Sequence, residues 1–338
     1  MFFLNRVMKK LLFLTFLMMP LCGFATSHGF FTYTPYGESL YADMHPNFVR
    51  VEFAFHTNHP AYDYAATMNK MRWTTLGLFG FNLPVWRGDF DNHRFGVSVT
   101  ETLSAHLWLD LFEPQTAPVI NTDYRIAAPT VTFLHRLNKG FAQNYSIAWS
   151  PFKHESTHIG DELQLSHVDA AYPLRRVNVS YNYTELVFTF NEPEQRLDAC
   201  HTFRAGLMLL LSPRDGWYSV KPADGEESFV QPRLSPWEAY LQYQYQSPAS
   251  KHGFQAVVSA EVRNRALYGY TYNGVGTQPE KRVFTYNVFV GARYNTPNYS
   301  GYFSRFIVGL RTYHGNCPYG QFRDINNYNQ LSLSIIFQ

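Results

Sequence analysis

The sequence predicts an all-β fold, a transmembrane antiparallel up-and-down β-barrel of about twelve strands. Three observations support this: strand-length segments alternate between apolar and polar residues, long and short connections alternate, and the composition is rich in aromatics. Of the 338 residues, 17% are aromatic and 16% are charged. Aromatic girdles around a polar lumen give this mix. A net charge of +2 without a basic stripe argues against a nucleic-acid partner.

Residues 1–25 have the features of a secretory signal peptide. Arg6, Lys9 and Lys10 precede the apolar run 11–19, and small or turn-forming residues lead to a cleavage site near Ala25. Residues 26–338 then form a single barrel domain. No later apolar run approaches the roughly 20 residues of a spanning helix, so any membrane insertion must use strands. We therefore expect export to the cell outer membrane.

Alternation with a period of two recurs along the chain, in 49–55, 177–183, 237–246, 254–263 and 331–335. In Val177-Asn-Val-Ser-Tyr-Asn-Tyr183 the odd positions are apolar or aromatic, so we expect them to face lipid and the even ones to face the lumen. A soluble sandwich also alternates, so this pattern alone does not decide the fold.

Connection lengths favour the barrel. We expect strands near 47–56, 71–83, 93–112, 123–135, 141–153, 174–190, 200–212, 235–247, 253–265, 281–294, 301–314 and 326–337. Links after odd-numbered strands are mostly long and those after even-numbered strands mostly short, which is typical of outer-membrane barrels with long external loops. Cys200 then starts a strand at the periplasmic side and Cys317 lies in an outer loop. Roughly 25 Å would separate them, far more than the ~7 Å a disulfide allows, so both thiols should be free.

The segment Trp149–Glu162 carries the densest set of reactive groups. His154 and Ser156 are two residues apart, so in a strand both lie on one face, where an imidazole can take a hydroxyl proton. Strict alternation from Asn144 and Ser146 sends them into the lumen. Pro151 favours a bulge, which inverts later side chains, and Phe152 shares the parity of His154. We favour the bulge, with both residues facing outward.

Two resemblances arise at these residues. His154-Glu-Ser-Thr-His-Ile-Gly-Asp-Glu162 is similar to the pattern His-x-Ser-Ser-His-Leu-Gly-Asp-Glu of an uncharacterised family of bacterial envelope proteins, with Thr157 in place of a serine. Leu40-Tyr-Ala-Asp-Met-His-Pro-Asn-Phe48 and Ile120-Asn-Thr-Asp-Tyr-Arg-Ile126 resemble further segments of that family. This resemblance implies an envelope location and a barrel, but no activity.

More weakly, the chain resembles outer-membrane phospholipase A, a twelve-stranded barrel with an outward His-x-Ser. Leu83-Pro-Val-Trp-Arg-Gly88 looks like a Pro-Leu-Trp-Arg-Gly turn of that family, and residues 319–329 are loosely similar. The family follows its serine with Asn-Gly-Arg, where this chain has Thr157-His-Ile159. The resemblance implies an asparagine from the next strand that orients the histidine, and Asn178 is the nearest candidate, although its parity points to the lumen.

Two classes of function follow. In a lipid esterase, Ser156 attacks an ester carbonyl, His154 is the base, Asn178 or a loop carboxylate holds the imidazole, and Asp161 with Glu162 binds calcium. Otherwise Gly160–Glu162 is only a turn, and the barrel is a narrow channel or a structural component. Its inner arginines would then favour anions or pair with Glu52, Glu238 and Glu261. The expected partners are outer-membrane lipids, and the expected state is a monomer or weak homodimer.

Overall fold

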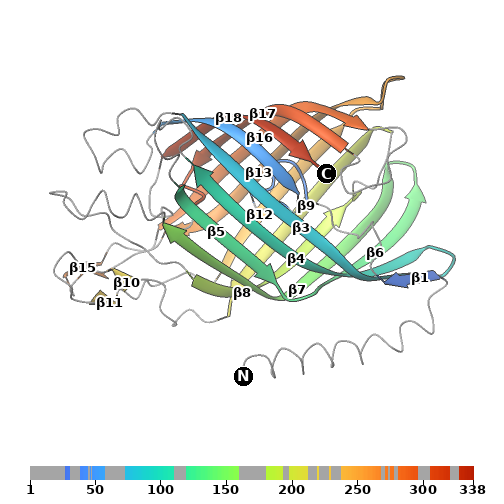
Figure 1. Ribbon diagram of the computed structural model, residues 1–338. Helices are drawn as coiled ribbons and strands as arrows, with labels where there is room; N and C mark the ends of the chain where they lie inside the picture. Colours follow the sequence, from blue (N-terminus) through green and yellow to red (C-terminus); the bar gives the residue numbers. More distant parts are fainter. Residues whose placement is uncertain are drawn as a thin grey trace.

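The computed structural model is a closed antiparallel barrel of twelve strands (Figure 1). It describes residues 27–30, 39–44, 46, 48–57, 73–109, 119–159, 180–192, 198–211, 219–220, 228–229, 237–267, 271–272, 275–277, 281–295, 305–319 and 327–338. The signal-peptide prediction for residues 1–25 lies outside these ranges.

The barrel strands are β2 (Val49–Thr57), β3 (Trp73–Phe90), β4 (Phe95–Leu109), β5 (Val119–Ala127) with β6 (Thr130–Lys139), β7 (Ala142–Ile159), β8 (Ser180–Phe190), β9 (Cys200–Leu210), β12 (Trp237–Gln246), β13 (Phe254–Leu267), β16 (Lys281–Asn295), β17 (Arg305–Gly315) and β18 (Tyr328–Phe337). β5 and β6 are two parts of one barrel strand, because both pair with β4 on one side and β7 on the other. Pairing of β18 with β2 closes the ring. All twelve expected strands are therefore confirmed.

The remaining strands are short. β1 (Ser27–Phe30) adds to the extension of β3 beyond the barrel wall, with Ser27 opposite Asp89. Two small hairpins, β10 (Ser219–Val220) with β11 (Ser228–Phe229) and β14 (Thr271–Tyr272) with β15 (Val275–Thr277), lie within long connections. Among the described residues, no helix is long and apolar enough to cross a membrane.

The connections alternate in length as expected. At one end of the barrel they span 58–72, 110–118, 160–179, 211–236, 268–280 and 316–327, and at the other 91–94, 140–141, 191–199, 247–253 and 296–304. The first group corresponds to the long loops that we expect outside the cell, so we call that end of the barrel the outer end.

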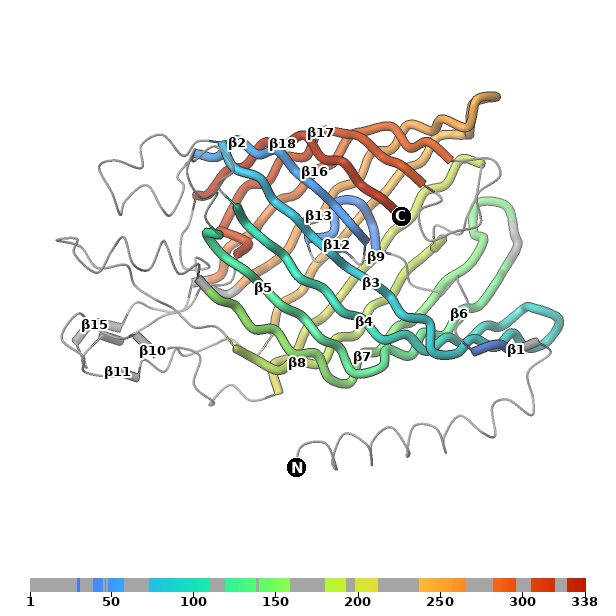
Figure 2. The backbone as a smooth tube through the Cα atoms, viewed as in Figure 1, coloured from blue at the N-terminus to red at the C-terminus, as the bar shows by residue number. Residues whose placement is uncertain are grey.

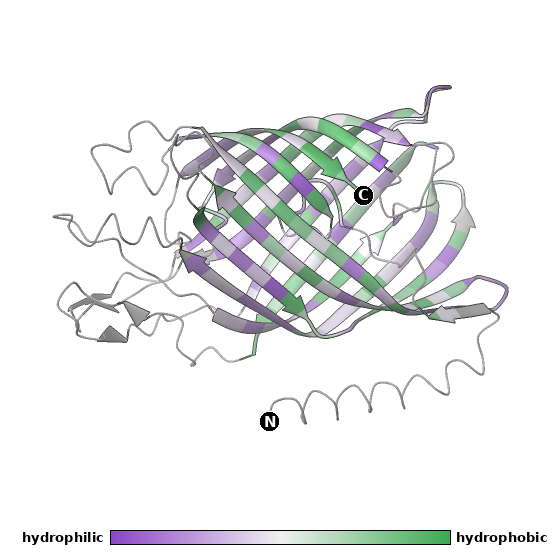
Figure 3. Ribbon diagram, viewed as in Figure 1, coloured by the Kyte–Doolittle hydropathy of each residue, from purple (hydrophilic) through white to green (hydrophobic). Residues whose placement is uncertain are grey.

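The outer surface of the wall is apolar and its inner surface is polar. Along β18, Leu331 and Leu333 are exposed outward (54% and 43%), whereas Ser332 and Ser334 are buried in the lumen. The alternation of hydropathy along the strands is visible across the barrel (Figure 3). In a sheet without free edges, this arrangement suits a lipid environment outside and polar contacts inside.

The expected orientation of β8 was wrong. Tyr181 and Tyr183 are buried in the lumen, and the residue between them, Asn182, faces outward. Tyrosine carries a hydroxyl on an aromatic ring, so it suits the lumen as well as the lipid side. The expected end of the second strand, 71–83, was also too early, because β3 continues through Pro84 to Phe90 with a bulge at Val85.

The lumen is filled by ion pairs and by a segment of the chain itself. Glu52 contacts both Arg50 (3.0 Å) and Arg311 (3.1 Å), and further pairs join Arg263 to Glu261 and Arg265 to Glu238. The salt-bridged interior, one of the two alternatives for the inner arginines, is therefore confirmed for these residues. Residues 39–44 and 46 precede β2 and fold into the lumen, where Figure 2 shows them in blue inside the ring of strands.

The placement of the cysteines is also confirmed. Cys200 begins β9 at the short-turn end, and Cys317 lies in the connection after β17 at the opposite end. Both are free thiols, and both are buried.

Candidate functional site

The bulge expected at Pro151 is present and sets the geometry of the site. On the β8 side, Ser150 pairs with Glu185 and Lys153 with Tyr183, so Pro151 and Phe152 together face only Thr184. Proline has no N–H to give to the ladder, which is why the extra residue is accommodated there.

Hydrogen bonds hold the bulge on both faces of the wall. The hydroxyl of Thr184 donates to the carbonyl of Ser150 (2.9 Å), and the indole N–H of Trp149 donates to Thr184 (3.2 Å). On the lumen side, the hydroxyls of Thr130 and Ser150 are 2.7 Å apart. These contacts give the Ser150 carbonyl and the neighbouring hydroxyls partners within the protein, as hydrocarbon surroundings favour.

The bulge turns His154 and Ser156 outward. Phe152 is 39% exposed on the lipid side, and His154 and Ser156 are half-buried on the same face. Glu155 and Thr157 alternate with them and are buried in the lumen, each only 1% exposed. The predicted outward face of the His-x-Ser pair is therefore confirmed.

His154 is hydrogen-bonded to an asparagine of the neighbouring strand. Its Nδ1 lies 2.8 Å from Oδ1 of Asn182, and the two residues are directly opposite in the β7–β8 register. An amide oxygen can only accept, so Nδ1 carries the proton and Nε2 is left with a free lone pair. Imidazole in this tautomer can act as a base through Nε2.

Asn182 was not among the expected site residues. Asn178, proposed for this role, lies outside the described residues. Because the even residues of 177–183 are expected to face the lumen, the sequence pattern does not point to Asn182 as an outward residue. The signal that could have identified it was the outward parity of Leu186 and Phe188 further along β8, both of which are exposed.

Ser156 lies at the outer end of β7, between Tyr124 of β5 and Ser180 of β8. His158 follows on the same face and contacts the ring of Tyr124 edge-on, with 5.9 Å between centroids. Within the described part of the chain, no hydrogen bond joins Ser156 to His154. The two side chains share a face at a spacing of two residues, which leaves room for a reacting group between them.

The wall below this pair is apolar. Ile126 lies opposite His154 on β5 and is 53% exposed, while Trp149 and Leu186 are 50% and 49% exposed on β7 and β8. These side chains continue the face of His154 toward the middle of the barrel wall.

A buried ion pair fixes the strand behind the site. Nε of Arg125 donates to Glu155 at 2.9 Å, and Thr157 donates to Asn121 at 3.2 Å. Both contacts join the lumen side of β7 to β5. Because Glu155 stands between His154 and Ser156, this pair holds the segment in the register that presents them outward.

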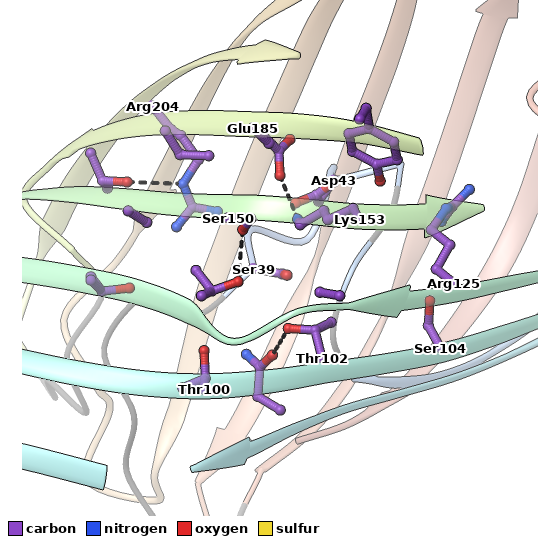
Figure 4. A pocket seen from close by; sticks show the side chains of 18 of the residues that line it. Ser39, Asp43, Thr100, Thr102, Ser104, Arg125, Ser150, Lys153, Glu185 and Arg204 are labelled. Atoms are coloured by element: carbon purple, nitrogen blue, oxygen red, sulfur yellow. Dashed lines mark hydrogen bonds and ion pairs between the residues drawn. The ribbon is translucent and has the colours of Figure 1, made fainter. Parts of the chain in front are cut away.

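A cavity of about 90 Å³ lies on the lumen side of the same strands (Figure 4). Its lining contains many hydroxyls as well as charged side chains, and on one wall of it Lys153 of β7 contacts Glu185 of the adjacent strand β8 at 2.5 Å. Residues Ser39 and Asp43 of the inserted segment line it as well. By volume it can hold several water molecules.

The predicted calcium ligands Asp161 and Glu162 lie outside the described residues. Within the described ranges, no group of three or more histidine, cysteine, aspartate or glutamate side chains could hold a metal ion.

No protein-family model matches the chain, and no curated protein matches it by sequence. Similar solved structures include the calcium-bound dimer of the outer membrane phospholipase of Salmonella typhi, with 10% identity, coverage of 87% of this chain and 91% of that one, and a TM-score of 0.47. Outer membrane phospholipase A of Escherichia coli has 10% identity, coverage of 86% and 96%, and a TM-score of 0.48.

An outer membrane channel from Pseudomonas putida F1 has 11% identity, coverage of 89% and 97%, and a TM-score of 0.42. Because enzymes and channels occur together at such low identity, these likenesses assign no role to this chain. The resemblance to the uncharacterised envelope family stays a prediction.

Proposed function

We propose that the chain is an outer-membrane lipid esterase, with Ser156 as nucleophile, His154 as general base and Asn182 as the residue that orients the imidazole. The observation that carries this proposal is the 2.8 Å hydrogen bond between His154 and Asn182 on the outward face that also presents Ser156. Histidine, a hydroxyl and a group that fixes the tautomer are the components of a serine hydrolase.

The reaction follows from these atoms. Oγ of Ser156 attacks the ester carbonyl carbon while Nε2 of His154 takes its proton, and that proton then passes to the leaving alcohol oxygen. Water, activated in turn by Nε2, attacks the acyl-serine and releases the fatty acid. Throughout, Oδ1 of Asn182 accepts the N–H at Nδ1 and stabilises the imidazolium that forms after each proton transfer.

The location of the site favours a lipid substrate. Ser156 lies near the outer end of the wall, above the apolar side chains of Ile126, Trp149 and Leu186. An ester at the boundary between headgroups and acyl chains would meet the serine there. The cavity on the lumen side of these strands is not lined by Ser156, which faces outward.

Hydrolysis in mixed micelles tests the proposal. Purified protein with phospholipid and calcium should release fatty acid, and Ser156→Ala or His154→Ala should each reduce the rate by several orders of magnitude, with little further loss in the double variant. Asn182→Ala should reduce the turnover number more than it changes the Michaelis constant. Thr157→Ala, which alters a lumenal side chain, should have a far smaller effect.

A fluorophosphonate probe gives a second measurement that needs no substrate. The parent should be labelled at Ser156, and His154→Ala should not be labelled. A Ser156→Ala variant as active as the parent would refute the proposal, as would an absence of turnover above a denatured control. Chelation of calcium tests the loop carboxylates separately: loss of activity that Asp161→Asn or Glu162→Gln reproduces would support their role.

Residence in the outer membrane with residues 154–173 outside has its own test. An epitope inserted near Ala170 should be detected on intact cells. Detection only after permeabilisation would reverse the orientation. The state expected in solution is a monomer or weak homodimer, which sedimentation in detergent would establish.

A further inference from the structure

The segment that precedes β2 occupies the barrel lumen. Leu40, Tyr41 and Ala42 are at most 2% exposed, although they belong to no strand of the wall. Tyr41 contacts the rings of Phe48 and Phe289, with centroids 5.9 and 5.8 Å apart. A lumenal apolar seat formed by Val257, Phe289, Ile307 and Ile336 packs against it. We call residues 39–44 and 46 the inner plug.

Side chains of three adjacent strands bind the backbone of the inner plug. The N–H of Tyr41 donates to Oε1 of Gln244 (3.0 Å), and the N–H of Ala42 donates to the hydroxyl of Ser259 (3.1 Å). Nδ2 of Asn287 donates 2.6 Å to the carbonyl of Ala42. Polar side chains of the wall therefore bind the backbone of a segment that belongs to no strand of the wall.

Other polar atoms on the same wall have no protein partner. The side-chain amide of Gln246 and Oε1 of Gln242 are buried and unpartnered among the described residues. Both belong to β12, the strand that carries Gln244. Buried amides of this kind usually bind water or a ligand.

The charges of the lumen are largely neutralised in pairs. Glu52 is held between Arg50 and Arg311, and the pairs Arg263–Glu261 and Lys153–Glu185 lie on the strands around the plug. The cavity beside the plug is lined by many hydroxyls and by charged side chains of both signs, several of which are paired with each other, such as Lys153 with Glu185. Amides and hydroxyls therefore remain available to a solute beside charges that largely offset one another.

We propose that the barrel is a pore for small, uncharged hydrophilic solutes and that the inner plug holds it closed. The apolar seat keeps the plug in place, so the resting pore is shut. When the plug moves out of the lumen, the side chains of Gln244, Ser259 and Asn287 lose their hydrogen bonds to its backbone. They can then hydrogen-bond to the hydroxyl groups of a solute that passes through the lumen. The adjoining cavity becomes part of the same path. Barrel diameter grows with strand number, so the twelve-stranded wall encloses a lumen intermediate between the filled interior of an eight-stranded barrel and the water-filled channel of a sixteen-stranded one.

Liposome swelling with a monosaccharide tests the proposal on the full chain. Ala42→Trp places an indole at a position with no free space, and should release the plug and raise the swelling rate severalfold over the parent. Ala239→Trp, on the lipid side of β12, is the matched control and should swell like the parent. Heat-modifiable migration in gels verifies that each barrel is folded.

A disulfide lock distinguishes release of the plug from damage to the wall. Ala42→Cys with Ser259→Cys, in a chain whose Cys200 and Cys317 are replaced by alanine, should join the plug to β13. Adding Leu40→Trp to this pair should give slow swelling when oxidised and fast swelling after reduction. An anionic sugar of equal size should enter the open barrel more slowly than the neutral one.

Three results would overturn the proposal. A folded Ala42→Trp barrel that swells no faster than the parent would mean that the plug does not close a path. Equal swelling rates of the oxidised and reduced disulfide variant would also mean that the plug does not close a path. Faster entry of the anionic sugar than of the neutral sugar would contradict the proposed preference for uncharged solutes. None of these measurements depends on Ser156 or on hydrolysis.

Discussion

Deletion of Phe152 should turn the candidate catalytic pair from the lipid face to the lumen. Pro151 and Phe152 share a single partner across the β7–β8 register, so removing one of them restores two-residue alternation through the strand. Either the residues after the bulge or those before it must then change faces. The free-energy cost of each alternative decides which half of β7 changes faces.

Inverting the half after the bulge breaks the buried pair between Arg125 and Glu155, a loss of about 3–5 kcal/mol. Inverting the half before the bulge sends Asn144 and Ser146 into lipid, where each unsatisfied group costs several kcal/mol. It also removes the hydrogen bonds that these two residues make with Glu192 and forces Trp149 into a filled lumen. The half after the bulge should therefore invert, taking His154 and Ser156 inward.

A cysteine reporter measures the face directly. Ser156→Cys should react readily with a membrane-permeant maleimide when Phe152 is replaced by alanine, because that change keeps the residue count. In the deletion variant the rate should fall on the order of tenfold or more, since buried thiols are inert, and the unfolding free energy should drop by about 3–5 kcal/mol. Equal labelling in the two variants would refute the role assigned to the bulge.

Three further predictions concern the wall and the lumen. Glu52→Gln should lower the free energy of denaturant unfolding in micelles by about 3–5 kcal/mol, because Arg50 and Arg311 lose their shared carboxylate; an unchanged midpoint would contradict the ion-pair network. Gly206→Ala should destabilise the barrel by about 1–3 kcal/mol, because the added methyl meets the ring of Tyr240 at 2.0 Å, and Tyr240→Ala should remove most of that penalty if the clash is its cause. Alkylation after unfolding without reductant should label both Cys200 and Cys317, whereas a peptide pair linked through them would show that the barrel register is wrong.

Periodicity in the sequence determined where the strands lie better than it determined which way they face. Leucine and serine have clear preferences, so β18 was oriented without difficulty. Tyr181 and Tyr183 fit either environment, and the orientation of β8 was consequently reversed and Asn182 was missed. Pro151 predicts the bulge in β7 correctly, because a residue without an N–H cannot donate to the hydrogen-bond ladder. Pro84 lacks the same N–H, but there the sequence predicts the end of a strand, whereas β3 continues through it with a bulge.

The inner plug had no comparable signal. Its residues, Leu40-Tyr-Ala-Asp-Met44, show neither strand alternation nor a turn motif, and their burial depends on contacts with residues more than two hundred positions away, such as Gln244 and Ser259. Apolar residues on the lumen side, such as Phe289 and Ile307, are an indirect sign of a buried segment, because apolar side chains are unfavourable in a water-filled lumen. Long-range packing of this kind is not visible in local pattern.

The two prolines of the site region also give the barrel a seam. Val131 pairs with Trp149 and Ala127 with Lys153, so by count Pro129 stands opposite Pro151, and neither can donate across the β6–β7 boundary. The backbone N–H of Ala128 donates to the carbonyl of Phe152 (2.6 Å), and the hydroxyls of Thr130 and Ser150 (2.7 Å apart) add a side-chain contact beside the prolines. A barrel wall under strain from its bilayer opens most easily where the fewest backbone hydrogen bonds join neighbouring strands. A bilayer whose thickness does not match the wall is therefore expected to strain the barrel first at this position, beside His154.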